Sequence, residues 1–173
     1  MKAALTRCAL ALAACAYTCG QAQAQDPGQA QPYASFHQVD AVQASEFWLD
    51  SGFATEHFKR NRNLNGGNRG VGFEYRFLTT AVATAGGFVN SDRAWSDYVG
   101  VIWQPHAFGP IRLGAAIAAF NGYPRMRRGG WFPAVIPTAT YEYKRVGVNV
   151  GIVPSYKDRL YGGISVQLKV RLF

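Results

Sequence analysis

The sequence predicts an all-β protein, an eight-stranded antiparallel transmembrane β-barrel of the bacterial outer membrane. Eight runs of about 9–13 residues alternate between apolar and other side chains, which is the length and pattern of tilted membrane-spanning strands. The number of runs is even, and a secretory leader precedes them. No segment after the leader holds 18 consecutive apolar residues, so a transmembrane helix is not expected.

Residues 1–24 have the features of a signal peptide. Lys2 and Arg7 precede an apolar run, and Ala22-Gln23-Ala24 supplies a small-x-small cleavage site. The alternative is a lipoprotein signal with lipidation at Cys15, because "LAAC" fits that pattern. All three cysteines lie in the leader, so the mature chain would have no thiol for a disulfide, a metal site or a nucleophile.

Residues 25–45 are rich in Gln, Ala and Pro without a sustained period, and we interpret them as a flexible lead-in to a barrel over 46–173. The strands are predicted at 46–57, 69–78, 81–91, 95–105, 110–121, 131–144, 146–154 and 161–173. One face of each is apolar and is expected to contact lipid, with Phe47, Leu49 and Phe53 forming that face in the first strand. A soluble sandwich would instead show a uniformly polar second face.

The inward-facing residues divide into two sets along the barrel axis if both termini lie in the periplasm. Toward the periplasmic end comes a polar set: Glu74, Arg76, Arg112, Glu142, Asn149, Gln167, Lys169 and Arg171. Toward the outer end come small or apolar residues, among them Gly114, Ala116, Ala118, Ala134, Ile136 and Gly151. Such a lining leaves room for an acyl chain. The alternative is that aromatic side chains lean in and fill the space, namely Phe88, Tyr98, Phe120 and Phe132.

Positive charge gathers in the loops at the predicted outer end. The arginines there that we expect to bind lipid phosphates are Arg60, Arg62, Arg125, Arg127 and Arg128. Removing the leader, with Lys2 and Arg7, leaves the chain strongly basic. For a secreted chain, an anionic lipid surface is the expected partner and nucleic acid is not.

Two prolines interrupt the alternating pattern near the C-terminal end. Pro137 and Pro154 flank a hairpin whose turn is predicted at Lys144 and Arg145, so they are expected to face each other. Proline has no N–H for a ladder and is normally kept out of paired strands. The sheet is therefore expected to be weakened at one spot, on both strands.

With these features, the chain resembles the outer-membrane lipid A palmitoyltransferase family (PagP). The resemblance covers most of residues 46–173 and is best at "FPAVIP" through "GIVPSY" and at "FVNSDRAWSDYVGVIW". It implies that Pro137 and Pro154 form a lateral gate for lipid. It also implies a catalytic set at His57, Asn90 and Ser91, with Asn90 standing where the family has an aspartate.

The chain departs from the family pattern in further ways. The family has a second proline-marked opening between its first two strands, where this chain has Gly52 and no proline. The small glycine at the floor of the family's acyl pocket falls on Ile102, while Gly100 is kept, so the resemblance implies a shallower pocket. An amide at position 90 cannot take up a proton, and Asp92 would point the other way in a continuous strand.

Three functions remain open from the sequence. The first is an acyltransferase or acyl hydrolase acting on phospholipid and lipid A. The second is a related barrel that binds or passes lipid without chemistry, and the third is a structural or adhesive barrel. No metal and no cofactor is expected in any of them, and we expect a monomer.

Overall fold

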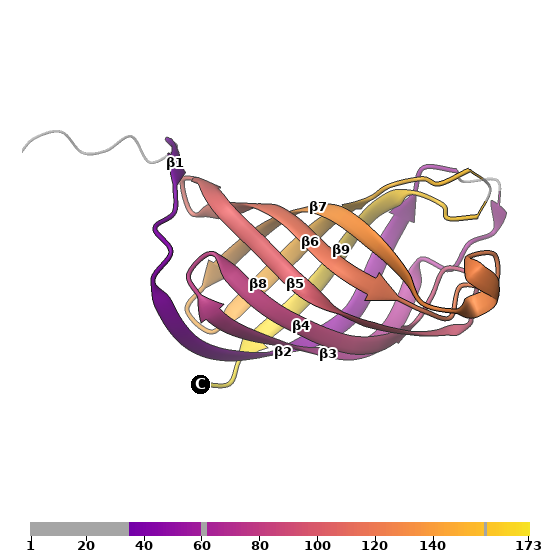
Figure 1. Ribbon diagram of the computed structural model, residues 1–173, viewed down its shortest axis with the longest axis horizontal. Helices are drawn as coiled ribbons and strands as arrows, with labels where there is room; N and C mark the ends of the chain where they lie inside the picture. The colour runs from indigo at the N-terminus through magenta and orange to yellow at the C-terminus, as the bar shows by residue number, and fades with distance from the viewer. Residues whose placement is uncertain (1–34, 60–61, 158) are drawn as a thin grey trace, which may run out of the picture. The chain divides into compact units, whose positions relative to one another are not determined.

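Antiparallel strands form one sheet that closes on itself in the computed structural model of the protein (Figure 1). Neighbours follow the order β1-β5-β4-β3-β2-β9-β8-β7-β6, and pairing of β6 with β5 closes the barrel through the eight strands β2 to β9. The strands are β1 (Phe36–Gln38), β2 (Gln43–His57), β3 (Gly67–Leu78), β4 (Ala81–Val89), β5 (Trp95–Phe108), β6 (Ile111–Phe120), β7 (Phe132–Tyr143), β8 (Val146–Val153) and β9 (Gly163–Arg171). The predicted eight-stranded antiparallel fold is confirmed.

The structure describes residues 35–59, 62–157 and 159–173. The predicted signal peptide, Cys15, the first part of the lead-in and Arg60 lie outside them. Within the described residues, one 3-10 turn, η2 (Arg127–Gly129), follows β6. No helix there is long and apolar enough to cross a membrane.

The predicted strands match the observed ones to within a few residues at each end. The largest differences lie at the N-terminal side, where β2 begins at Gln43 and the short strand β1 forms inside the expected lead-in. β5 extends past the start of β4, and β1 pairs with the edge that this leaves, from Phe36↔Phe108 to Gln38↔His106. Stacking of Phe36 on His106, at 5.2 Å between ring centroids, adds to that pairing.

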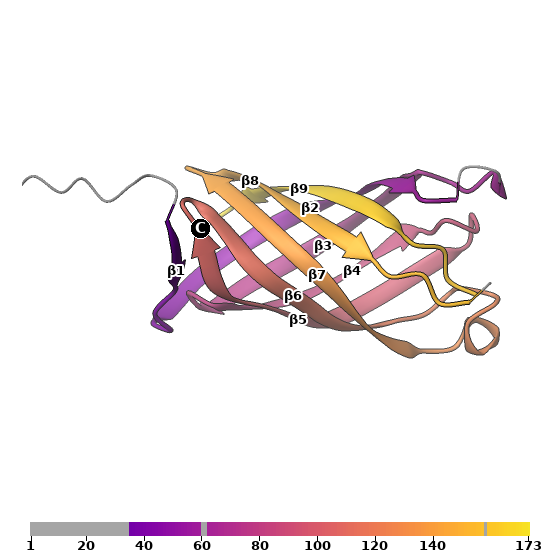
Figure 2. The ribbon, with the colours of Figure 1, turned by 90° about the horizontal axis from the view of Figure 1, so that it is seen from above.

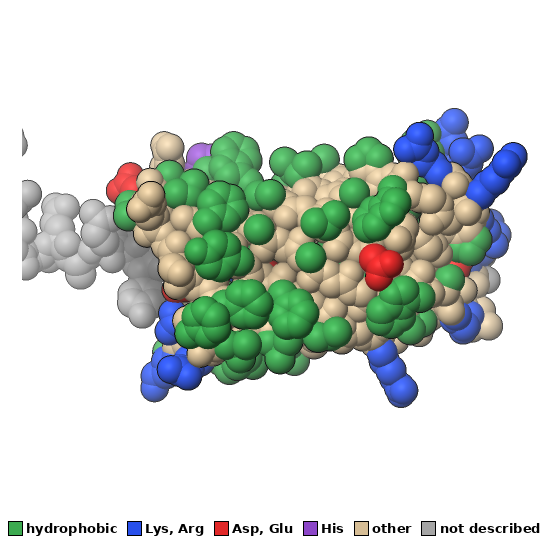
Figure 3. Space-filling view, turned by 60° about the horizontal axis from the view of Figure 1, so that its bottom comes forward, with side chains coloured by type: hydrophobic (Ala, Val, Ile, Leu, Met, Phe, Trp, Pro, Cys, Tyr) green, Lys and Arg blue, Asp and Glu red, His purple; other side chains and the backbone are tan. Residues whose placement is uncertain are grey.

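Apolar side chains cover the outside of the barrel wall. In β3, the outward residues Val71, Phe73, Tyr75 and Phe77 are all exposed, while the residues between them are mostly buried. Figure 3 shows hydrophobic side chains over the middle of the molecule, with lysines and arginines gathered toward its ends. We call this outward surface the apolar belt. An exposed apolar surface of this extent is typical of a contact with lipid or with another protein.

The two ends of the barrel differ. The terminus end carries β1, the C-terminus and the short turns 79–80, 109–110 and 144–145. The loop end carries the connections 58–66, 90–94, 121–131 and 154–162, with η2 among them (Figure 1).

Buried ion pairs fill the half of the interior nearest the terminus end. Lys169 Nζ lies 2.7 Å from Glu74 Oε2 and 2.8 Å from Glu142 Oε1, and Arg76 pairs with Glu142 and Glu46. Asn149 and Gln167 extend the network, since Asn149 Nδ2 donates to Glu74 Oε1 at 2.7 Å and to Gln167 Oε1 at 3.3 Å. The predicted polar set therefore does face inward. Because burying an unpaired charge is costly, these contacts fix the side-chain packing of this half of the interior, which we call the polar floor.

Candidate functional site

A bulge in β2 sets the direction of the site's histidine. The register of β2 shifts against β3 between Ser51 and Phe53, and against β9 between Asp50 and Phe53. Before the bulge Asp50 is buried inside, whereas after it Phe53 and His57 face inward. A bulge inserts one residue and so exchanges the two faces of a strand. The prediction that Phe53 lies on the lipid face was therefore wrong, because the alternation does not continue through the bulge.

Glycine is required at the bulge by the close approach of β3. A Cβ on Gly52 would lie 2.2 Å from the carbonyl oxygen of Asn68 and 2.4 Å from the backbone nitrogen of Gly70. Any side chain at this position would push the two strands apart. Gly52 thus allows the bulge, and the bulge turns His57 inward.

His57 and Ser91 form a hydrogen-bonded pair at the loop end of the barrel. His57 Nε2 lies 2.7 Å from Ser91 Oγ, and the histidine is 8% exposed. Ser91 follows directly after Asn90 in the turn that ends β4, and its carbonyl accepts a hydrogen bond from Asn65 N at 3.0 Å. The structure brings together these two residues of the predicted set, in the geometry of a nucleophile and its base.

Asn90 has a different role from the one that the resemblance implies. It is fully buried, and its Nδ2 donates to Ser96 Oγ at 2.8 Å and to the Gly122 carbonyl at 2.9 Å. Its Oδ1 accepts from the backbone N–H of Asp92 at 2.9 Å and of Ala94 at 3.1 Å. All four hydrogen bonds that an amide side chain can make are in use. Asn90 therefore shapes the turn that presents Ser91, and its amide is not free to bind an oxyanion.

Asp92 faces the same cavity as Ser91. The strand ends at Val89, and residues 91 and 92 belong to a turn, so the expectation that Asp92 points away does not hold. Glu56 is exposed on the outer surface beside His57, which places this end of β2 beyond the apolar belt. Burial lowers the pKa of His57, and the charges of Glu56 and Asp92 oppose that shift. The imidazole is thereby kept neutral and able to accept a proton at neutral pH.

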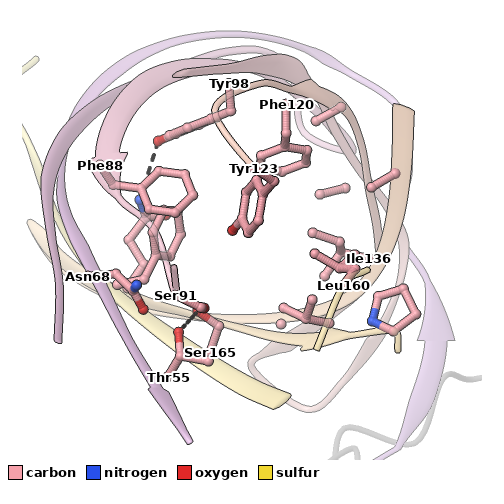
Figure 4. A pocket seen from close by; sticks show the side chains of 18 of the residues that line it. Thr55, Asn68, Phe88, Ser91, Tyr98, Phe120, Tyr123, Ile136, Leu160 and Ser165 are labelled. Atoms are coloured by element: carbon pink, nitrogen blue, oxygen red, sulfur yellow. Dashed lines mark hydrogen bonds between the residues drawn. The ribbon is translucent and has the colours of Figure 1, made fainter. Parts of the chain in front are cut away.

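A cavity of about 130 Å³ extends from this pair into the barrel. Figure 4 looks into it, with Ser91 on one side, Ile136 and Leu160 on another, and Tyr123 reaching toward the centre. Its lining includes Thr84, Ile102, Asn149 and Gln167. Asn149 and Gln167 also belong to the polar floor. The lining is predominantly apolar, which suits a hydrocarbon chain.

Both interpretations of the inward face proved partly correct. The aromatic side chains do lean inward and form a connected row, with ring centroids 6.0 Å apart for Phe88–Tyr98, 5.9 Å for Tyr98–Phe120 and 6.2 Å for Phe120–Phe132. They line the cavity together with small and aliphatic residues, so they narrow it without filling it.

The predicted acyl-pocket residues divide into two groups. Ile102, Ala116, Ala118 and Gly151 line the cavity. Gly100 and Gly114 do not, and their small size serves strand packing instead. A Cβ on Gly100 would lie 2.4 Å from the Ala118 side chain, and one on Gly114 would lie 1.9 Å from the Trp103 carbonyl oxygen.

The ladder between β7 and β8 is complete only at the terminus end. Pairing runs from Tyr143↔Val146 to Thr138↔Gly151 and stops there, although β7 continues to Phe132 and stays paired with β6 from Tyr141 to Phe132. Figure 2 shows the two strands separating toward the loop end. We call this unpaired stretch, between residues 132–137 and 152–154, the seam.

Proline removes hydrogen-bond donors on both sides of the seam. Backbone N–H groups alternate between the two edges of a strand. A continuous β6–β7 ladder is possible only if Pro133 and Pro137 direct their missing N–H away from β6, toward β8. The N–H groups of Ala139 and Tyr141 then also point toward β8, so their partners Val150 and Val148 point theirs toward β7. Pro154 lies an even number of residues from both, so its missing N–H would also point toward β7.

The prolines are offset by two positions rather than directly opposed. Extending the observed register would place Pro137 against Ile152 and Pro154 against Val135. These would be two successive hydrogen-bonded pairs, and each lacks one donor. Pro154, Val153 and Ile136 also line the cavity, so the cavity reaches the seam. The predicted weakening is present, and only the exact facing of the prolines was wrong.

β2 and β3, between which the resemblance places a second opening, are paired with each other. Their ladder continues across the bulge to Phe53↔Asn68 and Ala54↔Gly67, and Thr55 N donates to the Gly66 carbonyl at 2.8 Å. This agrees with the lack of proline in either strand.

The arginines expected to bind phosphate are spread over the loop end. Arg62 and Arg125 line a second, polar pocket beside Ser91, and Arg93 lines it with them. Arg127 and Arg128 belong to η2, outside that pocket. Arg93 was not among the arginines expected to bind phosphate. Tyr161, which lines both pockets, gave no signal in the sequence, because its position depends on how the 154–162 loop folds back.

No protein-family model matches the chain, and no curated protein matches it in sequence. Among the described residues, no group of three or more His, Cys, Asp and Glu side chains is placed to hold a metal ion. The fold defines an eight-stranded antiparallel barrel, a class that fits outer-membrane proteins in general.

Proposed function

We propose that this protein is an outer-membrane enzyme of the PagP type, which takes an acyl chain from a phospholipid and transfers it to lipid A. One observation carries the proposal: a hydrogen-bonded Ser91–His57 pair lies at the mouth of an apolar cavity that reaches an unpaired seam in the barrel wall. A lipid tail entering through the seam would bring its ester to the serine. The apolar belt and the closed sheet support a location within the membrane.

The chemistry follows from the pair. Ser91 Oγ attacks the ester carbonyl carbon while its proton passes to His57 Nε2, and the tetrahedral intermediate then breaks its bond to the lysolipid oxygen. His57 returns the proton to that leaving oxygen. A hydroxyl of lipid A attacks the acyl-serine in the reverse sequence, and water in its place would give hydrolysis. No external oxidant or reductant is needed, and the burial of His57 keeps the base neutral.

The cavity sets an expected limit on the acyl chain. Ile102 is buried and lines the cavity, and Tyr98 and Phe120 narrow it. A chain shorter than palmitoyl is therefore the preferred substrate, in agreement with the shallower pocket that the resemblance implies.

The test is mass spectrometry of lipid A from Gram-negative cells that express the wild-type chain, Ser91→Ala or His57→Asn. The proposal expects one added acyl chain with the wild type only, and all three proteins recovered as folded barrels. Unchanged lipid A with the wild type, together with no release of fatty acid from phospholipid vesicles, would contradict it.

A second candidate is a barrel that binds lipid without transferring its chain. The continuous pairing of β2 with β3 favours this candidate, because it removes the second lateral route that the resemblance implies. It expects the wild type and Ser91→Ala to bind acyl chains equally well, and neither to alter lipid A.

A further inference from the structure

The polar pocket at the loop end adjoins the acyl cavity at the reactive serine. Ser91, Asp92 and Tyr161 line both spaces. The two spaces differ sharply in character: one is lined mainly by apolar and aromatic side chains, the other by arginine and polar ones. Together the two spaces match an amphiphilic ligand, because an apolar space and a polar space meet at Ser91.

Tyr161 organises two of the pocket's arginines. It is buried, and its hydroxyl accepts a hydrogen bond from Arg125 Nη1. The guanidinium carbon of Arg125 lies 5.4 Å from the centroid of the tyrosine ring, and that of Arg62 lies 5.7 Å from it. Two guanidinium groups are thus positioned by contacts with one aromatic ring.

Arg93 approaches the pocket from the turn after β4. Its Nη1 donates to the Asn63 carbonyl at 3.1 Å, and its Nη2 lies 3.4 Å from Asn63 Oδ1. These partners are neutral, so they hold the guanidinium in place without cancelling its charge. Among the residues that the structure describes, three arginines and one acid, Asp92, line the pocket.

We propose that this pocket binds the phosphate group of the lipid whose acyl chain occupies the cavity. The inference rests on the proposed function, because it takes the tail to lie in the cavity and the ester to lie at Ser91. The paired N–H donors of an arginine guanidinium match the spacing of phosphate oxygens and bind them through charge-assisted hydrogen bonds. The phosphate would then fix which ester of the lipid reaches the serine, and neutral lipids would be poor donors.

The test is a binding measurement that needs no turnover. The purified chain is kept in an uncharged maltoside detergent, and a fluorescent acyl probe in the cavity is displaced by dodecyl phosphate, by dodecanol or by inorganic phosphate. We expect dodecyl phosphate to compete at least about tenfold better than dodecanol. Arg93→Gln and Arg125→Gln should each remove most of that preference. Arg128→Gln is the matched control, because it removes the same charge from the same end outside the pocket.

The outcomes separate this inference from the proposed function. Loss of the preference in the two pocket variants, with dodecanol binding intact, supports the inference. A preference that survives in both variants, or that falls equally in Arg128→Gln, overturns it while leaving tail binding established. Inorganic phosphate that binds the pocket as well as dodecyl phosphate would make it a free-phosphate site and overturn the headgroup assignment. Failure of every alkyl competitor and of the acyl probe to bind would defeat both proposals.

Discussion

Replacing Asn90 by aspartate restores the residue that the resemblance implies, yet the structure predicts that it damages the site. The two side chains have nearly the same shape, but a carboxylate cannot donate to Ser96 Oγ or to the Gly122 carbonyl. Because Asn90 is fully buried, both lost bonds would leave buried acceptors facing a negative charge. At about 1–3 kcal/mol for each of the two unsatisfied buried groups, Asn90→Asp should destabilise the turn by roughly 2–6 kcal/mol.

The assay compares wild type, Asn90→Asp and Asn90→Ala for acyl transfer and for unfolding in urea from vesicles, followed by gel mobility and tryptophan fluorescence. Both variants should lose activity, because Ser91 no longer meets His57 at hydrogen-bond distance. Asn90→Asp should recover part of its stability at low pH, where its carboxyl is protonated and can donate one hydrogen bond. An aspartate variant that is as stable as the wild type and more active would refute the reasoning.

The remaining predictions concern the bulge, the seam and the base. Gly52→Ala should abolish activity while leaving a folded barrel, because its Cβ would overlap the backbone of β3 and undo the bulge that directs His57 inward; an unchanged imidazole NMR signal and full activity would contradict this. The double variant Pro137→Ala, Pro154→Ala should regain up to two ladder bonds, raise the free energy of unfolding by roughly 1–3 kcal/mol and slow the entry of an acyl probe; equal entry rates would disprove the role of the seam. Because burial lowers the pKa of His57, the plot of kcat/KM against pH should stay flat through the ordinary histidine range and fall only at lower pH, as the imidazole becomes protonated. A rate that rises on acidification would rule out His57 as the base.

The sequence predicted the strands well because a barrel wall alternates with a period of two, which the strands keep except at bulges such as the one in β2. It could not predict the β2 bulge, since a single added residue leaves no signal beyond a glycine such as Gly52. The faces of Phe53 and His57 depend on that bulge, so the resemblance, and not the alternation, pointed to His57.

Residues outside the strands were harder to interpret. Asn90 matched a catalytic position by resemblance, yet its four hydrogen bonds depend on where Ser96 and Gly122 lie in the folded chain. The polar pocket unites the 58–66, 90–94, 121–131 and 154–162 loops, and nothing in the sequence fixes how loops meet. Arg93 and Tyr161 could be assigned to it only from the structure.

The polar floor closes the interior of the barrel toward the terminus end. Glu74, Lys169 and Asn149 close the cavity at the middle of the barrel, so an apolar chain that enters near Ser91 cannot leave through the terminus end. A chain must therefore both enter and leave on the loop side of this floor, through the seam or through the mouth beside Ser91, and it has to leave before a second chain can occupy the cavity. A released fatty acid or lysolipid should therefore act as a competitive inhibitor of the donor, and a planar bilayer containing the protein should carry no ionic current.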